Sequence, residues 1–272
     1  MRSTFLILSA AACFSALASA QENYSLWPRR PAELEQAQRL IREHSYEEAL
    51  SLLAPFVHKT GLAGHESRQL AGAIRVRRYL SAENPKIRLH TVKRGENVER
   101  IAVAYKSSAD LIVLINAMME PSNLKVGQKL RVIPQDLRAE LHPASHELSV
   151  WDGRTLVAAY DVEPTQDLLP AEGAGNEETR VKDRDGELNG ARVPRSSALF
   201  ISSNRTLKLA NGTALVGAES SARSKAVRMQ QRDLNELSLL LGSGARVSVV
   251  HDEKGFDPFP SSAATAPEAE NK

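Results

Sequence analysis

Cysteine is almost absent from this 272-residue sequence, and the single one, Cys13, lies near the amino terminus. The sequence also contains no Walker loop, no dinucleotide-binding glycine fingerprint and no G-x-S-x-G elbow. Its formal net charge of +2 is too small to indicate nucleic acid as a partner. The composition, with 42% hydrophobic and 25% charged residues, suits a soluble protein of two or three modules and leaves its function open.

Residues 1–20 have the pattern of a secretory signal peptide. Arg2 is followed by a short apolar run, and small residues lead to an A-x-A cleavage site at Ala18–Ala20. The apolar run is too short to span a bilayer, so we predict a mature chain that begins near Gln21, in the periplasm or outside the cell. Lipoprotein anchoring through Cys13 is the less favoured alternative, because the three alanines before it lack the usual bulky aliphatic residue. In the favoured case the mature chain has no thiol.

The next region, residues 21–84, is predicted to be helical. Apolar residues recur at helical spacing in PAELEQAQRLIREHSYEEALSLLAPFV, and a break near His44-Ser45 predicts two helices. A third helix is predicted from about Glu66 to Leu80. The first pair resembles one tetratricopeptide-type hairpin, but no second copy follows at that family's period. We therefore expect this region to pack against the rest of the protein rather than to bind a peptide.

The segment Leu89–Pro134 has the order strand, helix, helix, strand. Asn97 stands where a helix N-cap is expected, because its side-chain oxygen can accept a hydrogen bond from an unpaired backbone N–H. Ser107 and Asp110 have capping-box-like spacing before a second helix, which is predicted to end at Asn116. The apolar face of the first helix is predicted to consist of Val98, Ile101, Ala102 and Tyr105.

This order, with T-V-x-x-G-E at the start and V-G-Q-K-L-x-V-I-P at the end, resembles a LysM domain over residues 88–135. LysM domains bind glycans built on N-acetylglucosamine, chiefly peptidoglycan or chitin. The resemblance implies a groove between the loop after the first strand and the loop after the second helix. Backbone groups at a glycine turn can bind an acetamido group, and apolar side chains can contact the sugar, although core packing is the alternative role for Val98 and the methionines. The candidate glycan-binding residues are Gly95, Glu96, Asn97, Val98, Asn116, Ala117, Met118 and Met119.

Residues 140–252 are predicted to form a mostly β domain. ELSVWDGRTLVAAYDV places Leu148 and Val150 on one face, turns at Asp152-Gly153 and continues from Leu156 to Val162, which predicts a hairpin. Residues 173–189 are polar and are predicted to form a long loop. The tail, residues 253–272, is predicted to be disordered. The remaining predicted elements are strands in ALFISS and TLKLA, a helix over Met229–Leu241 capped by Gly242, and a final strand over Arg246–Val250.

The order of these elements resembles the catalytic domain of bacterial L,D-transpeptidases, which cross-link peptidoglycan through a cysteine thioester. That family carries Ser-His-Gly-Cys-x-Arg-Met, of which Val227-Arg228-Met229 remains here. Ala226 stands at the cysteine position, after Arg223, Ser224 and Lys225, and the family's upstream His-Gly-Thr corresponds to Asn211-Gly212-Thr213. A domain without the nucleophile and its histidines cannot form the acyl intermediate, so the resemblance implies a retired enzyme. The retained arginine is then explained by an ion pair that supports the fold.

The sequence as a whole therefore predicts a multidomain α+β protein that binds peptidoglycan without catalysis. We expect no cofactor, no metal, no nucleic acid and no membrane span, and the third domain is expected to hold peptide stems or a protein partner such as a cell-wall enzyme. His142 and His146 are four residues apart, but Pro143 argues against a helix that presents both to one metal. The alternatives are an assembly scaffold, a chance resemblance, or a wall-modifying enzyme that uses Asp233 and Glu236, for which a solvated helix face is the simpler explanation.

Overall fold

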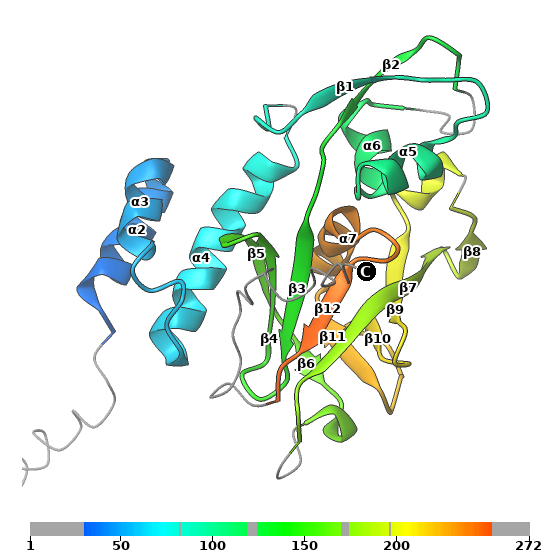
Figure 1. Cartoon of the computed structure of the whole chain (residues 1–272). Helices are drawn as coiled ribbons and strands as arrows, with labels where there is room; N and C mark the ends of the chain where they lie inside the picture. Colours follow the sequence, from blue (N-terminus) through cyan, green and yellow to red (C-terminus); the bar gives the residue numbers. More distant parts are fainter. Residues whose placement is uncertain (1–29, 82, 119–123, 170–173, 196, 252–272) are drawn as a thin grey trace, which may run out of the picture. The chain divides into compact units, whose positions relative to one another are not determined.

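The chain forms two compact units, Met1–Leu52 and Leu53–Lys272. The computed structural model describes residues 30–81, 83–118, 124–169, 174–195 and 197–251 (Figure 1). The predicted signal peptide with Cys13, the predicted tail and Met119 lie outside these ranges. Within them, no helix is both long enough and apolar enough to cross a membrane.

The first unit contains the predicted helical pair. Helix α2 (Ala32–Arg42) and helix α3 (Tyr46–Leu53) are separated by His44, whose φ of 61° is left-handed and interrupts the helical backbone. The break predicted near His44-Ser45 is therefore confirmed. Leu34 and Ala37, three residues apart on α2, are both buried, in agreement with the helical spacing of the apolar residues.

The segment that resembles a LysM domain has the predicted strand–helix–helix–strand order. Its strands pair antiparallel, with Arg88 opposite Val132, and Leu130 and Val132 face the module's own apolar core. Asn97 is the predicted N-cap, because its Oδ1 accepts the backbone N–H of Arg100 at 2.8 Å. The elements are β1 (Arg88–Thr91), α5 (Val98–Ala104), α6 (Ala109–Ile115) and β2 (Lys129–Val132).

The start of helix α6 differs from the prediction. Its N-cap is Ser108 rather than Ser107, and the Ser108 side chain makes no capping hydrogen bond. The reason lies outside the module, because Asp110 and the Ser108 hydroxyl both meet the side chain of Arg184, which is far away in the sequence. Tertiary contacts therefore determine the roles of these two side chains.

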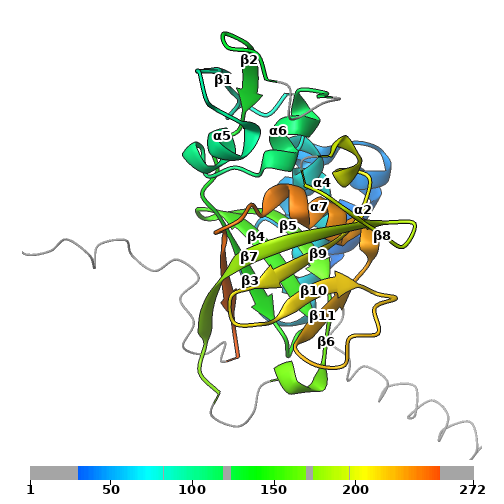
Figure 2. The same cartoon turned by 90° about the vertical axis from the view of Figure 1, so that its right-hand side faces the viewer.

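Ten strands form one large sheet within the described residues, in the order β5-β4-β3-β12-β7-β9-β10-β11-β6, with β8 paired to β7 (Figures 1 and 2). The predicted hairpin is confirmed, with Asp152 opposite Thr155 and a φ of +58° at Gly153. Together with the helices, this sheet confirms the predicted mixed α+β class. The strands are β3 (Leu137–His142), β4 (Glu147–Asp152), β5 (Thr155–Asp161), β6 (Glu163–Pro164), β7 (Glu177–Leu188), β8 (Ala191–Val193), β9 (Asn204–Leu209), β10 (Ala214–Gly217), β11 (Ala226–Met229) and β12 (Arg246–Val249).

The long loop predicted over residues 173–189 is wrong, because most of it is strand β7. Buried positions alternate with more exposed ones along this strand, but the buried residues include Arg184 and Gly186 as well as Val181. The sequence therefore lacks the alternation of apolar and polar residues that would indicate a strand. The strand predicted in ALFISS is also wrong. That segment begins as the 3₁₀ helix η3 (Ala198–Phe200), where the Ser197 hydroxyl accepts the N–H of Leu199. TLKLA was predicted correctly and lies mostly in β9.

Two helices pack on the large sheet. Helix α4 (Gly61–Tyr79) begins five residues before its predicted start and lies on β5 (Figure 1), where a Cβ at Gly72 would come within 2.6 Å of the Ala159 backbone nitrogen. Helix α7 (Gln231–Leu240) follows β11 and buries Leu234 and Leu237 in the main core. The predicted cap role of Gly242 is wrong. The helix ends at Leu240 with Leu241 as its C-cap, and Gly242 instead allows close approach, because a Cβ there would lie 2.8 Å from the Ser107 carbonyl oxygen.

Candidate functional site

The first candidate glycan loop is built around a left-handed turn at Gly95, whose φ is +83°. The Gly95 carbonyl accepts a hydrogen bond from Arg100 Nη1 at 2.7 Å. The Glu96 carboxylate accepts the backbone N–H of Lys93 at 2.7 Å and contacts His90 Nε2 at 2.8 Å. These two hydrogen bonds, the one from Lys93 first, hold the pKa of Glu96 below its usual value. The side chains around this turn therefore fix the loop backbone, which is exposed at Gly95.

The other two candidates in this loop differ in exposure. Asn97 is exposed at its position before α5, with its side-chain oxygen engaged in the helix cap. Val98 is 2% exposed and packs in the module core. Core packing is the alternative role that we considered for Val98. The accessible part of this loop is thus formed by the backbone of the turn and by Asn97.

The second candidate loop begins where α6 ends. The Asn116 side chain is tied to β2, because its Nδ2 donates to the Arg131 carbonyl and its Oδ1 accepts the Arg131 N–H, both at 2.8 Å. Ala117 is exposed with a φ of 49°, and Met118 is half-buried against the module core. Val98 and Met118 belong to the same apolar cluster, so the structure brings the two loops to one core. The supporting roles of Arg100 and Arg131 were not predicted from the sequence.

The position that aligns with the transpeptidase cysteine lies inside a strand pair. Ala226 begins β11 and is 0% exposed. Its N–H donates to Thr165 Oγ1 at 3.1 Å, and its carbonyl accepts the Thr165 N–H at 2.8 Å. The neighbouring Lys225 N–H donates to Asp167 Oδ2 at 2.9 Å, and hydrogen bonds from Thr165 and Lys225 lower the pKa of Asp167. Thr165 and the Asp167 carboxylate therefore accept the backbone N–H groups of Ala226 and Lys225 at the start of β11.

The retained arginine of the transpeptidase-like motif orders a loop. We predicted an ion pair for Arg228, but in the described part of the chain its guanidinium donates to backbone carbonyls, to Ser220 at 3.2 Å and to Ala222. The upstream Asn211-Gly212-Thr213 forms a turn in which Asn211 Oδ1 accepts the Thr213 N–H at 3.1 Å, and Gly212 has a φ of +88°. The side chains of Arg228 and Asn211 are thus both used in hydrogen bonds to the backbone of nearby loops and turns.

The alternative catalytic pair does not lie on a purely solvated helix face. The Tyr160 hydroxyl donates to Glu236 Oε1 at 3.0 Å. Burial raises the pKa of Glu236, and burial together with the nearby Glu236 charge raises that of Tyr160. Asp233 further raises the pKa of Glu236. The Tyr160–Glu236 bond joins β5 to α7, a structural role that the helical spacing did not indicate.

His142 and His146 give no indication of a metal centre. His142 lies on β3, with its Nε2 3.8 Å from Glu140 Oε2, and His146 lies in the turn before β4 with a φ of 56°. Among the residues that the structure describes, no group of three or more His, Cys, Asp or Glu side chains could hold a metal ion.

A buried ionic cluster joins the LysM-like module to the large sheet. Arg184 Nη1 on β7 donates to Asp110 Oδ2 at 2.7 Å and to the Ser238 carbonyl at 3.2 Å. Arg205 on β9, 1% exposed, lies 3.6 Å from the same Asp110 oxygen and also donates to the Ser238 hydroxyl. Helices α6 and α7, which carry Asp110 and Ser238, are adjacent in Figure 2. This cluster fixes the module against the sheet.

The comparisons with known proteins bear on two regions. The LysM domain family model matches residues 90–132. The predicted LysM resemblance is confirmed. This match covers the LysM-like module described above, which we call the LysM module. No curated protein matches the chain.

Solved structures that are similar to this chain have low sequence identity and low TM-scores. Bd1075 of Bdellovibrio bacteriovorus is 9% identical, with 43% of this chain and 48% of that chain covered and a TM-score of 0.31. L,D-transpeptidase 1 of Mycobacterium tuberculosis is 10% identical, with 45% and 66% covered and a TM-score of 0.30. An L,D-transpeptidase of Xylanimonas cellulosilytica is 13% identical, with 82% and 96% covered and a TM-score of 0.30. The aligned part spans less than two thirds of the first two proteins.

Restoring a cysteine at position 226 is expected to give an unreactive thiol. The Ala226→Cys variant would place the sulfur at a fully buried position, where solvent and substrate have no access. We expect no cross-linking of peptidoglycan fragments and a reaction with a thiol reagent at least about tenfold slower than that of Ser224→Cys, whose position is exposed. Measurable transpeptidation by Ala226→Cys would show that this position is accessible to substrate and would contradict the retired-enzyme interpretation.

Proposed function

We propose that this protein binds peptidoglycan in the cell envelope without catalysing its cross-linking. The match of residues 90–132 to the LysM domain carries the proposal, because it supports binding of glycans that contain N-acetylglucosamine. Among the described residues of the two candidate loops, Gly95, Asn97 and Ala117 are exposed, and Val98 and Met118 support these loops from the shared core. The glycan would therefore contact mainly loop backbone and small side chains.

The absence of cysteine from residues 14–272 supports a non-catalytic transpeptidase-like domain. A thioester needs a cysteine sulfur, and the position that aligns with the family's nucleophile holds a buried alanine. Export by the signal-peptide pattern of residues 1–20 would bring the protein to the cell wall. The third domain would then hold a second component, either a peptide stem or a cell-wall enzyme.

Fixed attachment of the LysM module strengthens this proposal. A single LysM groove offers few contacts, so we expect it to bind weakly alone. The Asp110, Arg184 and Arg205 cluster holds the module against the sheet, so a second contact on the same wall polymer would be made without further loss of orientational freedom.

Blocking the second candidate loop is expected to remove wall binding. The Ala117→Arg variant adds a long side chain at an exposed position, and we expect the affinity for insoluble peptidoglycan to fall by about tenfold or more in co-sedimentation. Leu89→Arg is the matched control, because Leu89 is also exposed in this module and the variant has the same added charge. Equal binding by both variants would show that the glycan lies elsewhere. Point variants are preferred to deletion of the module, which would leave Arg184 and Arg205 without Asp110.

Incubation of the chain with insoluble peptidoglycan, as in the co-sedimentation experiment, also distinguishes an enzyme from an assembly scaffold. New cross-links or released fragments in a muropeptide analysis would indicate an enzyme, and loss of that activity in Glu236→Gln would identify the pair Asp233 and Glu236 as the candidates. If neither the unchanged chain nor the Leu89→Arg control sediments with the wall, the proposal fails and a scaffold that uses the amino-terminal helices is favoured.

A further inference from the structure

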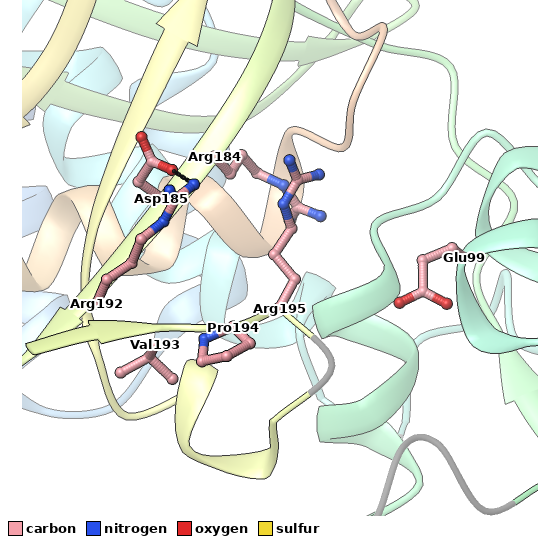
Figure 3. Close-up of a pocket in the computed structure, with 7 residues that line it drawn as sticks. All are labelled: Glu99, Arg184, Asp185, Arg192, Val193, Pro194 and Arg195. Atoms are coloured by element: carbon pink, nitrogen blue, oxygen red, sulfur yellow. Dashed lines mark hydrogen bonds and ion pairs between the residues drawn. The ribbon is translucent and has the colours of Figure 1, made fainter.

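A pocket of about 610 Å³ lies where the LysM module meets the hairpin of β7 and β8. Glu99 on α5 forms one side, and the other side is formed by the hairpin and the residues after it (Figure 3). Strand β11, which carries Ala226, is separated from β7 by β9 and β10, so this pocket is distinct from the position that aligns with the transpeptidase cysteine. Its lining residues are Glu99, Arg184, Asp185, Arg192, Val193, Pro194 and Arg195.

Two exposed arginines on the hairpin side are oriented by carboxylates. Arg192 Nη2 donates to Asp185 Oδ1 at 2.8 Å, and Arg195 Nη2 donates to Asp183. Both arginine side chains remain substantially exposed. A guanidinium has five N–H donors, so one bond to a carboxylate orients the group and leaves further donors for a ligand. This side of the pocket is therefore suited to a carboxylate ligand.

The back of the pocket contains a buried donor without a partner. Arg184 is 4% exposed, and its Nη1 bonds to Ser108, Asp110 and Ser238. Its Nε is buried and makes no hydrogen bond in the described structure. Figure 3 shows the Arg184 side chain extending from β7 toward the side of the pocket where Glu99 lies. An unpaired buried N–H is unfavourable by about 1–3 kcal/mol, and because this Nε has no solvent access, a ligand oxygen would reach it only after a shift of the neighbouring side chains.

The opposite side of the pocket carries a single negative charge. Glu99 is exposed in the first turn of α5 and directly follows the first candidate glycan loop, Gly95–Val98. In Figure 3 its carboxylate lies across the pocket from the arginines. A ligand that fits both sides would need a carboxylate for the arginines and an ammonium group for Glu99.

We infer that this pocket binds the zwitterionic amino-acid end of a peptide, with its carboxylate toward Arg184, Arg192 and Arg195 and its ammonium group toward Glu99. The inference rests on the proposed function, because a peptide stem attached to a glycan in the LysM loops would lie close to this pocket. It assigns the stem to the junction between the module and the sheet, rather than to the region of Ala226. Glycan and stem of one wall polymer would then be bound together.

The test uses the mature full chain and the tripeptide L-Ala–γ-D-Glu–meso-diaminopimelate, whose last residue carries a free ammonium and carboxylate at its distal end. We expect calorimetry to show binding, and Glu99→Gln and Arg195→Gln each to weaken it by about tenfold, as for loss of one charge-assisted hydrogen bond. Arg246→Gln is the matched control, since Arg246 is an exposed arginine on β12 outside the pocket. The tripeptide with an acetylated distal amine should bind as weakly to the unchanged chain as the free tripeptide binds to Glu99→Gln.

The outcomes separate this inference from the proposed function. If the chain sediments with the wall but the tripeptide does not bind, or binds equally to all variants, the pocket assignment is overturned and the proposed function remains. If neither wall nor tripeptide is bound, both are overturned. Binding of an N-acetylglucosamine tetramer should be unchanged in Glu99→Gln and Arg195→Gln, and its loss would show that these variants disturb the LysM loops rather than a peptide site.

Discussion

Replacing Asp110 with alanine is expected to lower the free energy of unfolding of the second unit by about 3–5 kcal/mol. Asp110 is the carboxylate shared by two buried arginines, with Arg184 Nη1 at 2.7 Å and Arg205 Nη1 at 3.6 Å. Without it both guanidiniums, 4% and 1% exposed, would stay buried with no counter-charge. Burial already lowers the pKa of Arg205, and the Asp110 charge opposes that effect. The cost therefore comes from two uncompensated charges.

Urea unfolding followed by tryptophan fluorescence measures this effect, with Trp27→Phe in every variant so that the buried Trp151 gives the signal. Asp136→Ala is the matched control, because Asp136 is exposed and lies 3.6 Å from Lys106 and 3.7 Å from Arg246. Loss of such surface pairs changes stability by about 1 kcal/mol or less. In the Asp110→Ala variant, limited proteolysis should cut the LysM module before the sheet.

A second variant distinguishes charge burial from packing. Asp110→Asn keeps the volume and removes the charge, and we expect it to be destabilised by nearly as much as Asp110→Ala. Replacing Arg184 by methionine in the Asp110→Ala background should restore part of the loss, because one unpaired buried charge is removed. Equal stabilities of Asp110→Ala and Asp136→Ala would show that the cluster does not hold the module in place.

The elements that the sequence predicts well are those with a local pattern. The LysM module and the β4–β5 hairpin combine apolar residues with a turn or cap, helix α7 has apolar periodicity alone, and all three occur near the predicted residues. Asn97 was placed correctly because an N-cap depends only on the next three residues. Such features need no information from distant parts of the chain.

The features that the sequence did not reveal depend on distant partners. Arg184 looked like part of a polar loop, because its burial requires Asp110, which is 74 residues away. Gly242 looked like a helix cap, although its role is to allow close contact with Ser107. The candidate pocket likewise combines Glu99 with residues near position 190. Contacts of this kind have no local periodicity, so spacing along the sequence could not predict them.

Replacing Glu147 with alanine is expected to destabilise the second unit by about 3 kcal/mol and to loosen helix α4. The Glu147 carboxylate, on β4, is 1% exposed. It accepts from His65 Nδ1 at 2.6 Å, from Arg68 Nη2 at 2.9 Å and from Arg68 Nε. Both partners lie on α4, so one buried carboxylate anchors this helix to the sheet. Its removal would leave the largely buried Arg68 without a counter-charge.

Asp161→Ala is the matched control for this prediction. Asp161 also bonds to His65, with its Oδ1 3.0 Å from Nε2, but its side chain is 77% exposed. A pair of this exposure contributes about 1 kcal/mol or less, because solvent screens the charges. The two variants remove carboxylates from the same histidine, so they differ mainly in burial and in the bonds to Arg68.

Trp151 allows local loosening of α4 to be detected. The His58 ring, just before α4, stacks on Trp151 with a centroid distance of 5.3 Å. If the anchor loosens, the near-ultraviolet circular dichroism of Trp151 should change in Glu147→Ala before the main unfolding transition and stay unchanged in Asp161→Ala. Equal losses of stability in the two variants would mean that Glu147 acts as an ordinary surface ion pair, and the anchoring of α4 would then rest on the close contact of Gly72 with β5.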